Sequence, residues 1–455
     1  MTAPHPGVSP LKVASASFVG TAVEWYDYFI YGMAAALVFG PQFFPDLSPA
    51  TGTLAAFATY SVGFLARPLG GVVMGHFGDR VGRKSMLVTS LVLMGTATVG
   101  IGLLPTYDTV GVWAPVLLVT LRFVQGIGVG GEWGGAVLMA VEHAPKNKRG
   151  FYGSFPQMGV PGGLILANVV FLVVSNNLTD KAFEDWGWRV PFLASGLLVV
   201  VGLVIRISIT ESPEFAKVKD AGEVDRKPIV TVLRQHPVQV LLAAGSFMGN
   251  NTVGYIFMSY LLSYGTTELG LSRTLMLTVT LVGAMAWLAI IPWASALSDR
   301  HGRRRVLLLG SGGLAVWTAV LFPLVDTASP ALVLIGILGT AVFLGITYGP
   351  VAVLFSDLFS AKVRYSGASL GYQIGSILGG GVAPTLATAL YAASDSSAPV
   401  TAYLVVVSLV SLVCLAVVTR DVRTGVPAAD TPAGSDAGTH IPHSAEKTRT
   451  VPDAR

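Results

Sequence analysis

The sequence predicts an all-α membrane protein with twelve transmembrane helices in two pseudo-symmetric six-helix bundles. Three observations lead to this prediction. Of the 455 residues, 52% are apolar and only 12% are charged, about half of the ~25% charge that is usual in soluble domains. Apolar stretches of about 20 residues, long enough to cross a bilayer, recur along the chain. The two halves also carry the same loop motif 220 residues apart, which indicates an internal duplication.

Turn-rich or charged connectors divide the chain into twelve apolar segments. In the first half they are expected at 13–39, 52–77, 86–104, 113–141, 151–175 and 188–209. In the second half they are expected at 236–264, 271–297, 306–324, 331–357, 365–391 and 399–419. The predicted domains are therefore an N-terminal bundle (1–209), a cytoplasmic linker (210–235), a C-terminal bundle (236–419) and a disordered, polar cytoplasmic tail (420–455).

Lys and Arg are distributed unevenly between the two sides of the predicted membrane. If both termini are cytoplasmic, only Lys181, Arg189 and Arg273 of the 29 Lys and Arg residues lie in outer loops, while Arg67 and Arg122 lie inside spans. Cytoplasmic loops of membrane proteins are enriched in Lys and Arg. The sequence therefore predicts that both termini are cytoplasmic.

Composition and motifs exclude several other classes of protein. The single cysteine, Cys414, allows no disulfide within the chain and no cysteine-based metal cluster. The glycine-rich run at 126–135 is neither preceded by a predicted strand nor followed by Lys-Ser or Lys-Thr, so it is not a phosphate-binding loop. Because no histidine cluster falls inside a span, we expect no membrane-embedded enzyme. We also expect no cofactor, no metal and no nucleic-acid partner.

The repeated loop motif has the order Asp-Arg-x-Gly-Arg followed by a basic residue. Its first copy runs from Asp79 to Lys84 and its second from Asp299 to Arg304. Retention of positive charge in the cytoplasm explains the basic residues, but it requires neither the Asp nor the Gly. We therefore predict a gating motif, with these positions: Gly75, Asp79, Arg80, Gly82, Arg83, Asp299, Arg300, Gly302 and Arg303.

These loops resemble the signature of the major facilitator superfamily, and other runs resemble its metabolite:proton symporter family, especially the bacterial shikimate- and α-ketoglutarate-type symporters. The runs are Glu24-Trp25-Tyr26-Asp27, 122–126, 130–135 and 211–215. The resemblance implies a proton-coupled secondary active symporter that imports a small organic anion, shikimate-like or a mono- or dicarboxylate, by alternating access. It implies a functional monomer in the bacterial plasma membrane. It also places Asp79 near the start of the span at 365–391, where the helix dipole favours an anion.

Five ionisable residues fall near the centres of predicted spans, namely Glu24, Asp27, Arg67, Arg122 and Glu132. Such groups are costly inside a bilayer and indicate function. Because burial favours the neutral form of a carboxyl group, we expect Asp27, Glu24 or both to carry the coupled proton. Arg122 offers a planar fork to a substrate carboxylate. Arg67 and Glu132 fall at one depth, counted at about 1.5 Å per residue, and are predicted to form a structural ion pair. In the alternative interpretation, all five form ion pairs that only hold helices together.

Polar and aromatic residues of the spans complete the predicted substrate site. Their hydroxyl and amide groups can hydrogen-bond to a hydroxylated or keto acid, although such groups also commonly join membrane helices. Together with Arg122 the candidates are Gln125, Tyr28, Tyr31, Gln157, Asn250, Asn251, Tyr255, Tyr348, Tyr372 and Gln373.

Other functions fit the same predicted fold. One is symport of a zwitterionic osmolyte such as betaine or proline, although the tail lacks the heptads of the osmolyte-sensing branch. Another is export of drugs or aromatic compounds, although the antiporter signature is only partly present in Gly159, Pro161, Gly162 and Gly163. A transporter-like sensor would require an output domain, for which the predicted layout leaves no room.

Overall fold

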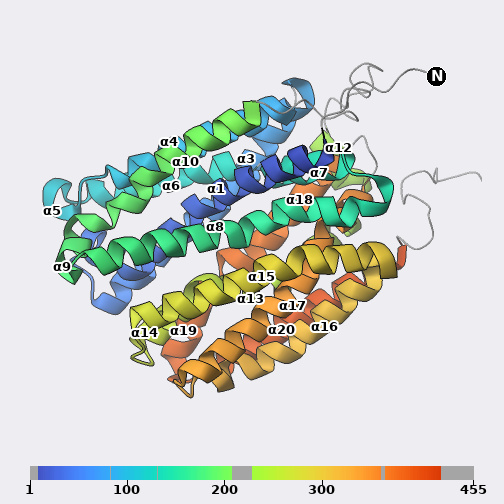
Figure 1. Cartoon of the computed structure of the whole chain (residues 1–455). Coiled ribbons are helices and arrows are strands. Elements are labelled where there is room, and N and C mark those ends of the chain that lie inside the picture. Colours follow the sequence, from blue (N-terminus) through green and yellow to red (C-terminus); the bar gives the residue numbers. More distant parts are fainter. Residues whose placement is uncertain (1–8, 82, 131, 208–227, 360–363, 422–455) are drawn as a thin grey trace, which may run out of the picture.

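The computed structural model describes residues 9–81, 83–130, 132–207, 228–359 and 364–421, and within these ranges every regular element is a helix (Figure 1). Most of the predicted linker and nearly all of the predicted tail lie outside the described residues, so the predicted domain boundaries stay predictions.

The first half of the chain forms six long helical segments and several short ones. The long ones are α1 (Pro10–Leu37), α3 (Pro49–Val81), α4 (Arg83–Gly102), α6 (Trp113–Val129) continued by α7 (Glu132–Glu142), α8 (Arg149–Asn177) and α10 (Arg189–Ile207). The short ones are α2 (Phe39–Phe43), α5 (Tyr107–Val110), η1 (Lys146–Lys148), α9 (Asp180–Ala182) and η2 (Phe183–Gly187).

The second half repeats this pattern. A short α12 (Pro228–Gln235) precedes α13 (Pro237–Tyr255), η3 (Ile256–Tyr260) and α14 (Leu261–Thr267), which form one long segment. The others are α15 (Arg273–His301), α16 (Arg303–Val325), α17 (Pro330–Asp357), α18 (Arg364–Ser376) with η4 (Ile377–Gly381) and α19 (Ala383–Ser394), and α20 (Ala398–Asp421).

Each of the twelve predicted segments is thus helical, with ends within a few residues of those expected. Nine of the described helical segments are long and apolar enough to cross a membrane. The remaining three are α1, α3 and the segment α13 to α14. Two of these three contain the buried charged residues Glu24, Asp27 and Arg67, and the third contains Asn250 and Asn251. The polar residues of these three segments belong to the candidate site. That the three segments cross the membrane stays a prediction.

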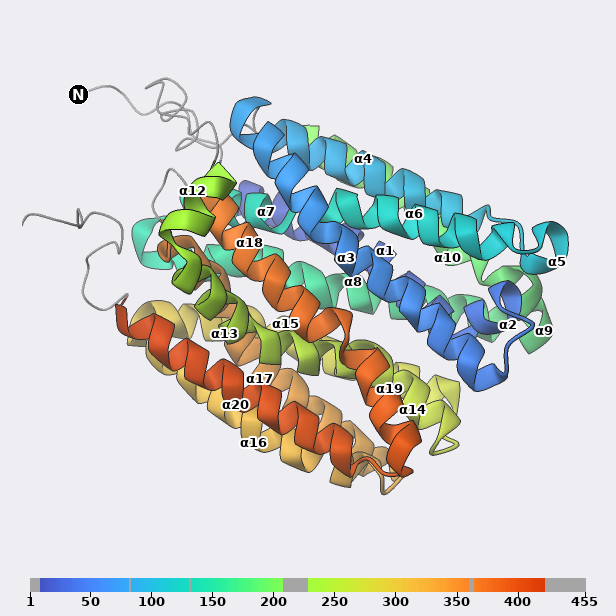
Figure 2. The ribbon, with the colours of Figure 1, turned by 180° about the vertical axis from the view of Figure 1, so that it is seen from behind.

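The two halves of the chain form separate groups of helices that lie side by side. Most of the blue-to-green helices are above and most of the yellow-to-red ones below in Figure 1, although α12 and α18 of the second half lie at the upper right beside the first group. The helix α8 contacts α15 across the boundary. Figure 2 shows the opposite side, where α3 lies along α18 and α19. The start of α1 and the end of α20 lie at the same end of the molecule. We call this end the terminal face and the opposite end the far face.

Glycines allow α6 to pack closely on α3 at the level of the site. A Cβ atom built on Gly126 would lie 2.3 Å from the carbonyl oxygen of Gly63, and one built on Gly130 would lie 2.1 Å from the carbonyl oxygen of Arg67. Small residues permit such close packing of membrane helices. The close approach brings Arg122, on α6, next to the aromatic residues of α1 and α3.

Candidate functional site

A cluster of aromatic rings occupies the boundary between the two halves. Tyr28 of α1 has its ring centroid 4.6 Å from that of Tyr60 and 5.9 Å from that of Tyr255, which belongs to the second half. Phe64 lies 5.2 Å from Tyr255. All four side chains are buried. The predicted residues Tyr28 and Tyr255 are therefore neighbours at the contact between the bundles.

Arg122 lies within this cluster, almost completely buried at 1% exposure. The carbon of its guanidinium group is 4.6 Å from the ring centroid of Tyr28, 4.2 Å from that of Tyr31 and 4.8 Å from that of Tyr60. Such cation–π contacts stabilise a charge that has left water. Opposite the guanidinium group, a Cβ on Gly63 would lie 2.7 Å from Arg122 Nε, so only glycine leaves room for it.

The hydrogen bonds of Arg122 leave one edge of its guanidinium group open. Nη1 donates to Oε1 of Gln125. Nε and Nη2 are buried and have no hydrogen-bond partner among the described residues. Together these two N–H groups form the side-on fork that binds a carboxylate through two parallel hydrogen bonds. The free edge is therefore chemically suited to an organic anion.

Asp27 is fully buried and is held by hydroxyl groups. Its Oδ1 accepts a hydrogen bond from Ser195 of α10, and its Oδ2 lies 3.0 Å from Oγ1 of Thr98, on α4. Nε2 of Gln125 donates to the same Thr98 oxygen at 2.8 Å. A continuous series of hydrogen bonds therefore connects Arg122, through Gln125 and Thr98, to Asp27. Nothing in the sequence distinguishes Thr98 and Ser195 from other hydroxyl residues of the spans.

The structure pairs Glu132 with a partner other than the predicted one. Glu132 forms a buried ion pair with Arg206 of α10, and Ser90 donates to Glu132 Oε2 at 3.0 Å. Arg67 instead places its guanidinium carbon 4.5 Å from the ring centroid of Phe64 and 4.8 Å from that of Tyr28. The predicted Arg67–Glu132 pair is therefore wrong. The sequence predicts only that Arg67 and Glu132 have the same depth, and depth does not specify which neighbouring helix a side chain faces.

Arg206 is the residue that the sequence reasoning missed. It falls near the end of the predicted span at 188–209, where a basic residue is typical of the cytoplasmic boundary, but it is only 5% exposed. A Cβ on Gly20 would lie 2.9 Å from its Nε and Nη2 atoms, and Glu24 is within electrostatic reach of both Arg206 and Arg67. An arginine within the apolar run Leu203–Ile207 was the available signal.

The remaining candidates make contacts between helices. Thr347 donates to Asn250 at 2.5 Å, and Asn251 donates to Ser376 at 3.1 Å, so both amides bond within the second half. The other four candidates, Gln157, Tyr348, Tyr372 and Gln373, join the two halves on the terminal side of the aromatic cluster. Gln157 donates to the Tyr348 carbonyl at 2.9 Å, and Gln373 donates to the Gly130 carbonyl at 2.7 Å. The Tyr372 ring stacks on Trp133 with centroids 4.0 Å apart.

Comparison with known proteins agrees with this architecture. The family model described as Major Facilitator Superfamily matches residues 17–380 and 279–441. The chain belongs to the Major Facilitator Superfamily. Its fold is also that of a solved superfamily member, the proton:xylose symporter XylE, with a TM-score of 0.73 over 91% of this chain and 96% of that one, at 17% sequence identity.

Among curated members of the superfamily, two from Escherichia coli K12 are each 44% identical to this chain. The inner membrane metabolite transport protein YhjE matches over 381 residues, 83% of this chain and 87% of its own. The shikimate transporter matches over 386 residues, with the same coverage. The proline/betaine transporter of the same organism is 35% identical over 93% of this chain and 86% of its own. This chain is therefore a multi-pass plasma-membrane transporter of metabolites and not an enzyme.

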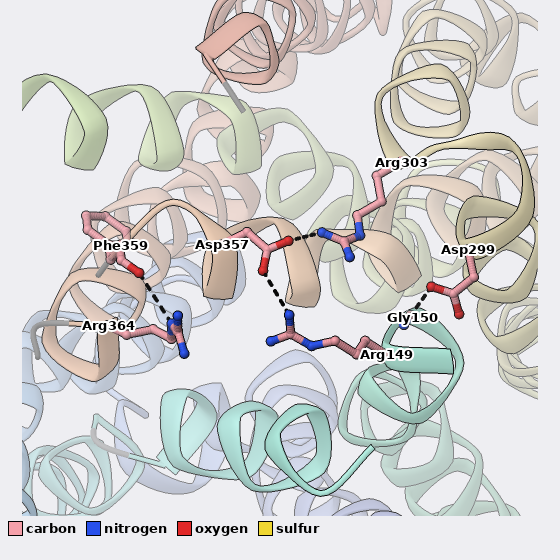
Figure 3. A network of polar contacts seen from close by, with 7 residues as sticks. All are labelled: Arg149, Gly150, Asp299, Arg303, Asp357, Phe359 and Arg364. Atoms are coloured by element: carbon pink, nitrogen blue, oxygen red, sulfur yellow. Dashed lines mark hydrogen bonds and ion pairs between the residues drawn. The ribbon is translucent and has the colours of Figure 1, made fainter. Parts of the chain in front are cut away.

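In the second half, the loop that carries the repeated motif lies within the described residues. Asp299 accepts a hydrogen bond from the backbone N–H group of Gly150 at 2.9 Å, at the start of α8 (Figure 3). It also accepts one from the backbone N–H group of Phe151 at 3.0 Å. Asp357, at the end of α17, pairs with both Arg149 and Arg303. We call Arg149, Gly150, Asp299, Arg303 and Asp357 the inter-half polar network, because it joins α8 to the second half at the terminal face.

Other gating positions are described less fully. Gly302 has a φ of 89° between α15 and α16, a conformation that glycine adopts without strain. The described part of the structure gives no side-chain surroundings for Gly75, Asp79, Arg80 and Arg83, and it does not include Gly82 at all. The predicted contact of Asp79 therefore stays a prediction, although Asp299 makes the corresponding contact in the other half.

Proposed function

We propose that this transporter is a proton-coupled symporter that imports a small organic anion, shikimate-like or a mono- or dicarboxylate, by alternating access. One observation carries the proposal. The buried guanidinium group of Arg122 leaves Nε and Nη2 without partners, while Nη1 is connected by hydrogen bonds to the buried acid Asp27. A substrate carboxylate would accept hydrogen bonds from Nε and Nη2 of Arg122, and a proton would neutralise Asp27.

The surroundings of Arg122 suit an acid that carries hydroxyl or keto groups. The hydroxyl groups of Tyr28, Tyr60 and Tyr255 are buried close to one another, with Tyr28 within hydrogen-bonding reach of the other two. Buried polar groups are normally hydrogen-bonded. These three groups can donate to or accept from the oxygens of a substrate whose carboxylate is bound to Arg122, so the site combines charge recognition with recognition of polar substituents.

Asp27 is the acid best placed to carry the proton, with Glu24 as the second candidate. Its bonding partners are the neutral hydroxyl groups of Ser195 and Thr98, and neutral partners stabilise its charge less than a cation would. Glu24, by contrast, lies within electrostatic reach of Arg206 and Arg67. We therefore assign the coupled proton to Asp27.

The positions of the basic residues support an orientation with both termini in the cytoplasm. Twelve spans, with the domain limits predicted above, would place the inter-half polar network on the cytoplasmic side. There it would hold the inner gate closed while the outer gate opens. Arg122 and Asp27 both lie in the first bundle and bond there only to first-bundle residues, so one chain contains the whole coupling site and a monomer suffices.

A zwitterion such as betaine is the second candidate, because aromatic rings bind quaternary ammonium groups. Here two arginines already use these ring faces: Arg67 and Arg122 both lie over Tyr28, at 4.8 and 4.6 Å. A positively charged ammonium group would therefore meet like charges. This arrangement favours an anion, and the choice between the two is an outcome of the test below.

Proteoliposomes with an inward proton gradient test the proposal. We expect gradient-driven accumulation of at least one carboxylate among shikimate, α-ketoglutarate, citrate and benzoate, abolished by a protonophore. Arg122→Lys keeps the charge but loses the fork. Loss of one charged hydrogen bond costs roughly 1.5–3 kcal/mol, so its half-saturation concentration should rise by about tenfold or more. Arg420→Lys, at the end of α20, is the control and should transport normally.

Two results would overturn the proposal. One is gradient-driven uptake of betaine or proline but of no carboxylate. The other is uptake of a carboxylate that Arg122→Lys leaves unchanged. Outward transport against an imposed gradient would instead support the exporter.

A further inference from the structure

We infer that Thr98 is a positioning residue whose hydroxyl hydrogen alternates between two acceptors, and that it thereby transmits the protonation state of Asp27 to the substrate-binding group Arg122. The inference rests on the proposed function, because it explains how the proton and the anion would be coupled.

Thr98 Oγ1 has more neighbours than its single hydrogen can serve. It lies 3.0 Å from Asp27 Oδ2 and 3.0 Å from the carbonyl oxygen of Met94, one turn earlier on α4. Both distances allow a hydrogen bond. The oxygen also accepts from Gln125 Nε2 at 2.8 Å. A hydroxyl group has one donor and two acceptor sites, so only one of the two oxygens receives the hydrogen at a time.

The charge of Asp27 decides which acceptor is used. When Asp27 is ionised, its carboxylate can only accept, and the Thr98 hydrogen points to Asp27 Oδ2. When Asp27 is protonated, its own O–H donates to Thr98 Oγ1, and the Thr98 hydrogen turns to the Met94 carbonyl. The bond from Gln125 persists in both arrangements, because Thr98 has two acceptor sites.

The same contacts assign the proton to one oxygen of Asp27. Ser195 donates to Oδ1, and the structure gives the Ser195 hydroxyl no second acceptor among the described residues. If Oδ1 were protonated and donated to Ser195, the Ser195 hydrogen would lose its partner inside the protein. Oδ2 faces Thr98, whose hydrogen does have an alternative. The proton therefore binds at Oδ2.

The change reaches Arg122 through Gln125. An ionised Asp27 polarises the series of hydrogen bonds, because neighbouring bonds in a chain strengthen one another in a medium of low dielectric constant. Gln125 Oε1, which accepts from Arg122 Nη1, then partly compensates the positive charge of the guanidinium group. Protonation of Asp27 removes this compensation. Arg122 then attracts an anion more strongly, so proton binding favours substrate binding and substrate binding favours protonation of Asp27.

Other charged or titratable groups near Asp27 are already engaged in the described structure or belong to the same helix. Glu24 and Tyr26 lie on α1, and Tyr26 donates to the Pro191 carbonyl. Glu132 of α7 and Arg206 of α10 pair with each other. The helix α3 contributes Arg67 and Tyr60, which lie against the aromatic cluster. Thr98 is the hydroxyl that connects Asp27 to Gln125, and through Gln125 to Arg122.

A threonine that bonds to the carbonyl group four residues earlier is common in helices and needs no function. Thr96 provides that ordinary case on the same helix. Its Oγ1 donates to Val92 O at 2.8 Å and the residue is exposed. Thr98 differs in being fully buried and in contacting two side chains of other helices. Thr96 is thus a matched control.

The test compares substrate affinity at pH 6 and pH 8 in the purified full-length protein, with a carboxylate that wild type accumulates. For wild type we expect tighter binding at pH 6, within the range of about 5- to 150-fold that is typical of coupled sites. Thr98→Ser and Thr96→Val should keep this ratio. Thr98→Val, which keeps the shape and removes the hydroxyl, should reduce it to about twofold or less, below that range. Its substrate counterflow should persist while gradient-driven accumulation falls.

The inference would be overturned if Thr98→Val kept the wild-type ratio of substrate affinities at pH 6 and pH 8. It would also be overturned if Thr98→Ser lost this ratio as fully as Thr98→Val, because packing at position 98, and not the hydroxyl group, would then explain the loss. If Thr98→Val does not elute as a folded protein in size-exclusion chromatography, Gln125→Met removes the next link. Gln125→Met should change the substrate affinity at both pH 6 and pH 8 and abolish the difference between the two. If the difference is retained, the inference is overturned. Failure of the proposed function looks different, since wild type itself would then show no gradient-driven uptake of a carboxylate.

Discussion

The ion pair between Glu132 and Arg206 lies inside the first bundle and is almost closed to solvent, with side-chain exposures of 0% and 6%. Arg206 also donates to the Leu87 carbonyl at 2.5 Å, and Ser90 donates to Glu132. These contacts join α4, α7 and α10. Removing one member of such a pair leaves an uncompensated buried charge, which is costly, whereas replacing both members with neutral groups is often tolerated.

Glu132→Gln should therefore lower the free energy of unfolding by roughly 3–5 kcal/mol. The loss should appear as a lower thermal midpoint of the purified protein in detergent. The double variant Glu132→Gln/Arg206→Met should recover much of the loss, because no unpaired charge then remains. An equal loss in the single and double variants would show that packing volume, and not charge, controls stability at this site.

At the scale of the element, the start of α8 depends on a side chain from the other half. None of the first helical residues of α8 is acidic, and no side chain of its own N-cap residue caps it. Asp299 supplies the missing acceptor through its bond to Gly150 (Figure 3) and a second bond to Phe151. A carboxylate there also interacts favourably with the helix dipole. The contact exists only while α8 and α15 lie together at the terminal face.

Asp299→Asn should weaken this closed arrangement. Loss of a capping interaction of this kind costs about 0.5–2 kcal/mol, and one or two kcal/mol corresponds to a factor of about 5–30 in population. Spin labels at the exposed positions Lys148 and Arg305, in a Cys414→Ala background, would report the opening as a longer distance in pulsed electron paramagnetic resonance.

Asp326→Asn is the control for this experiment. Asp326 accepts from Tyr264 at 2.8 Å and from Ser397 at 2.5 Å, so its contacts stay within the second half. It should leave the label distance unchanged. An unchanged distance in Asp299→Asn as well would contradict the gating role of the inter-half polar network.

At the scale of the whole molecule, the halves touch on both sides of the aromatic cluster. The inter-half polar network closes the terminal face. At the level of the aromatic cluster, Ser61 of α3 donates to the Gly381 carbonyl at 2.9 Å. Towards the far face, the guanidinium carbon of Arg273 lies 5.4 Å from the ring centroid of Phe183. The described residues therefore form a closed arrangement, and access to Arg122 from either side requires one set of these contacts to separate.

Fixing the contact between α3 and η4 should stop transport. The pair Ser61→Cys/Gly381→Cys in a Cys414→Ala background, joined by a short thiol cross-linker, should lose uptake and regain it on reduction. The matched control, Gly95→Cys/Val199→Cys, joins α4 to α10 within one half, where a Cβ on Gly95 would lie 2.3 Å from Val199. Equal inhibition of both pairs would mean that separation of α3 from η4 is not required.

At every scale, the amino-acid order alone determines properties that depend on local composition and position along the chain. The shortage of charge indicates lipid as the solvent, and the run of apolar residues predicts where each helix begins and ends. The cost of an ionisable group in lipid singles out five residues, with Asp27 and Arg122 among them. These are one-dimensional properties, so they can be read without knowing which helices are neighbours.

The tertiary structure decides which side chains meet. Depth along a helix placed Arg67 and Glu132 at one level, but the orientation of α3 turns Arg67 towards aromatic rings, while Glu132 faces Arg206. Thr96 and Thr98 differ by two positions in the sequence, yet only Thr98 faces Asp27 and Gln125. The physical reason is that a hydrogen bond requires two groups within about 3 Å. Helix packing sets that distance, and it brings together residues far apart in the chain.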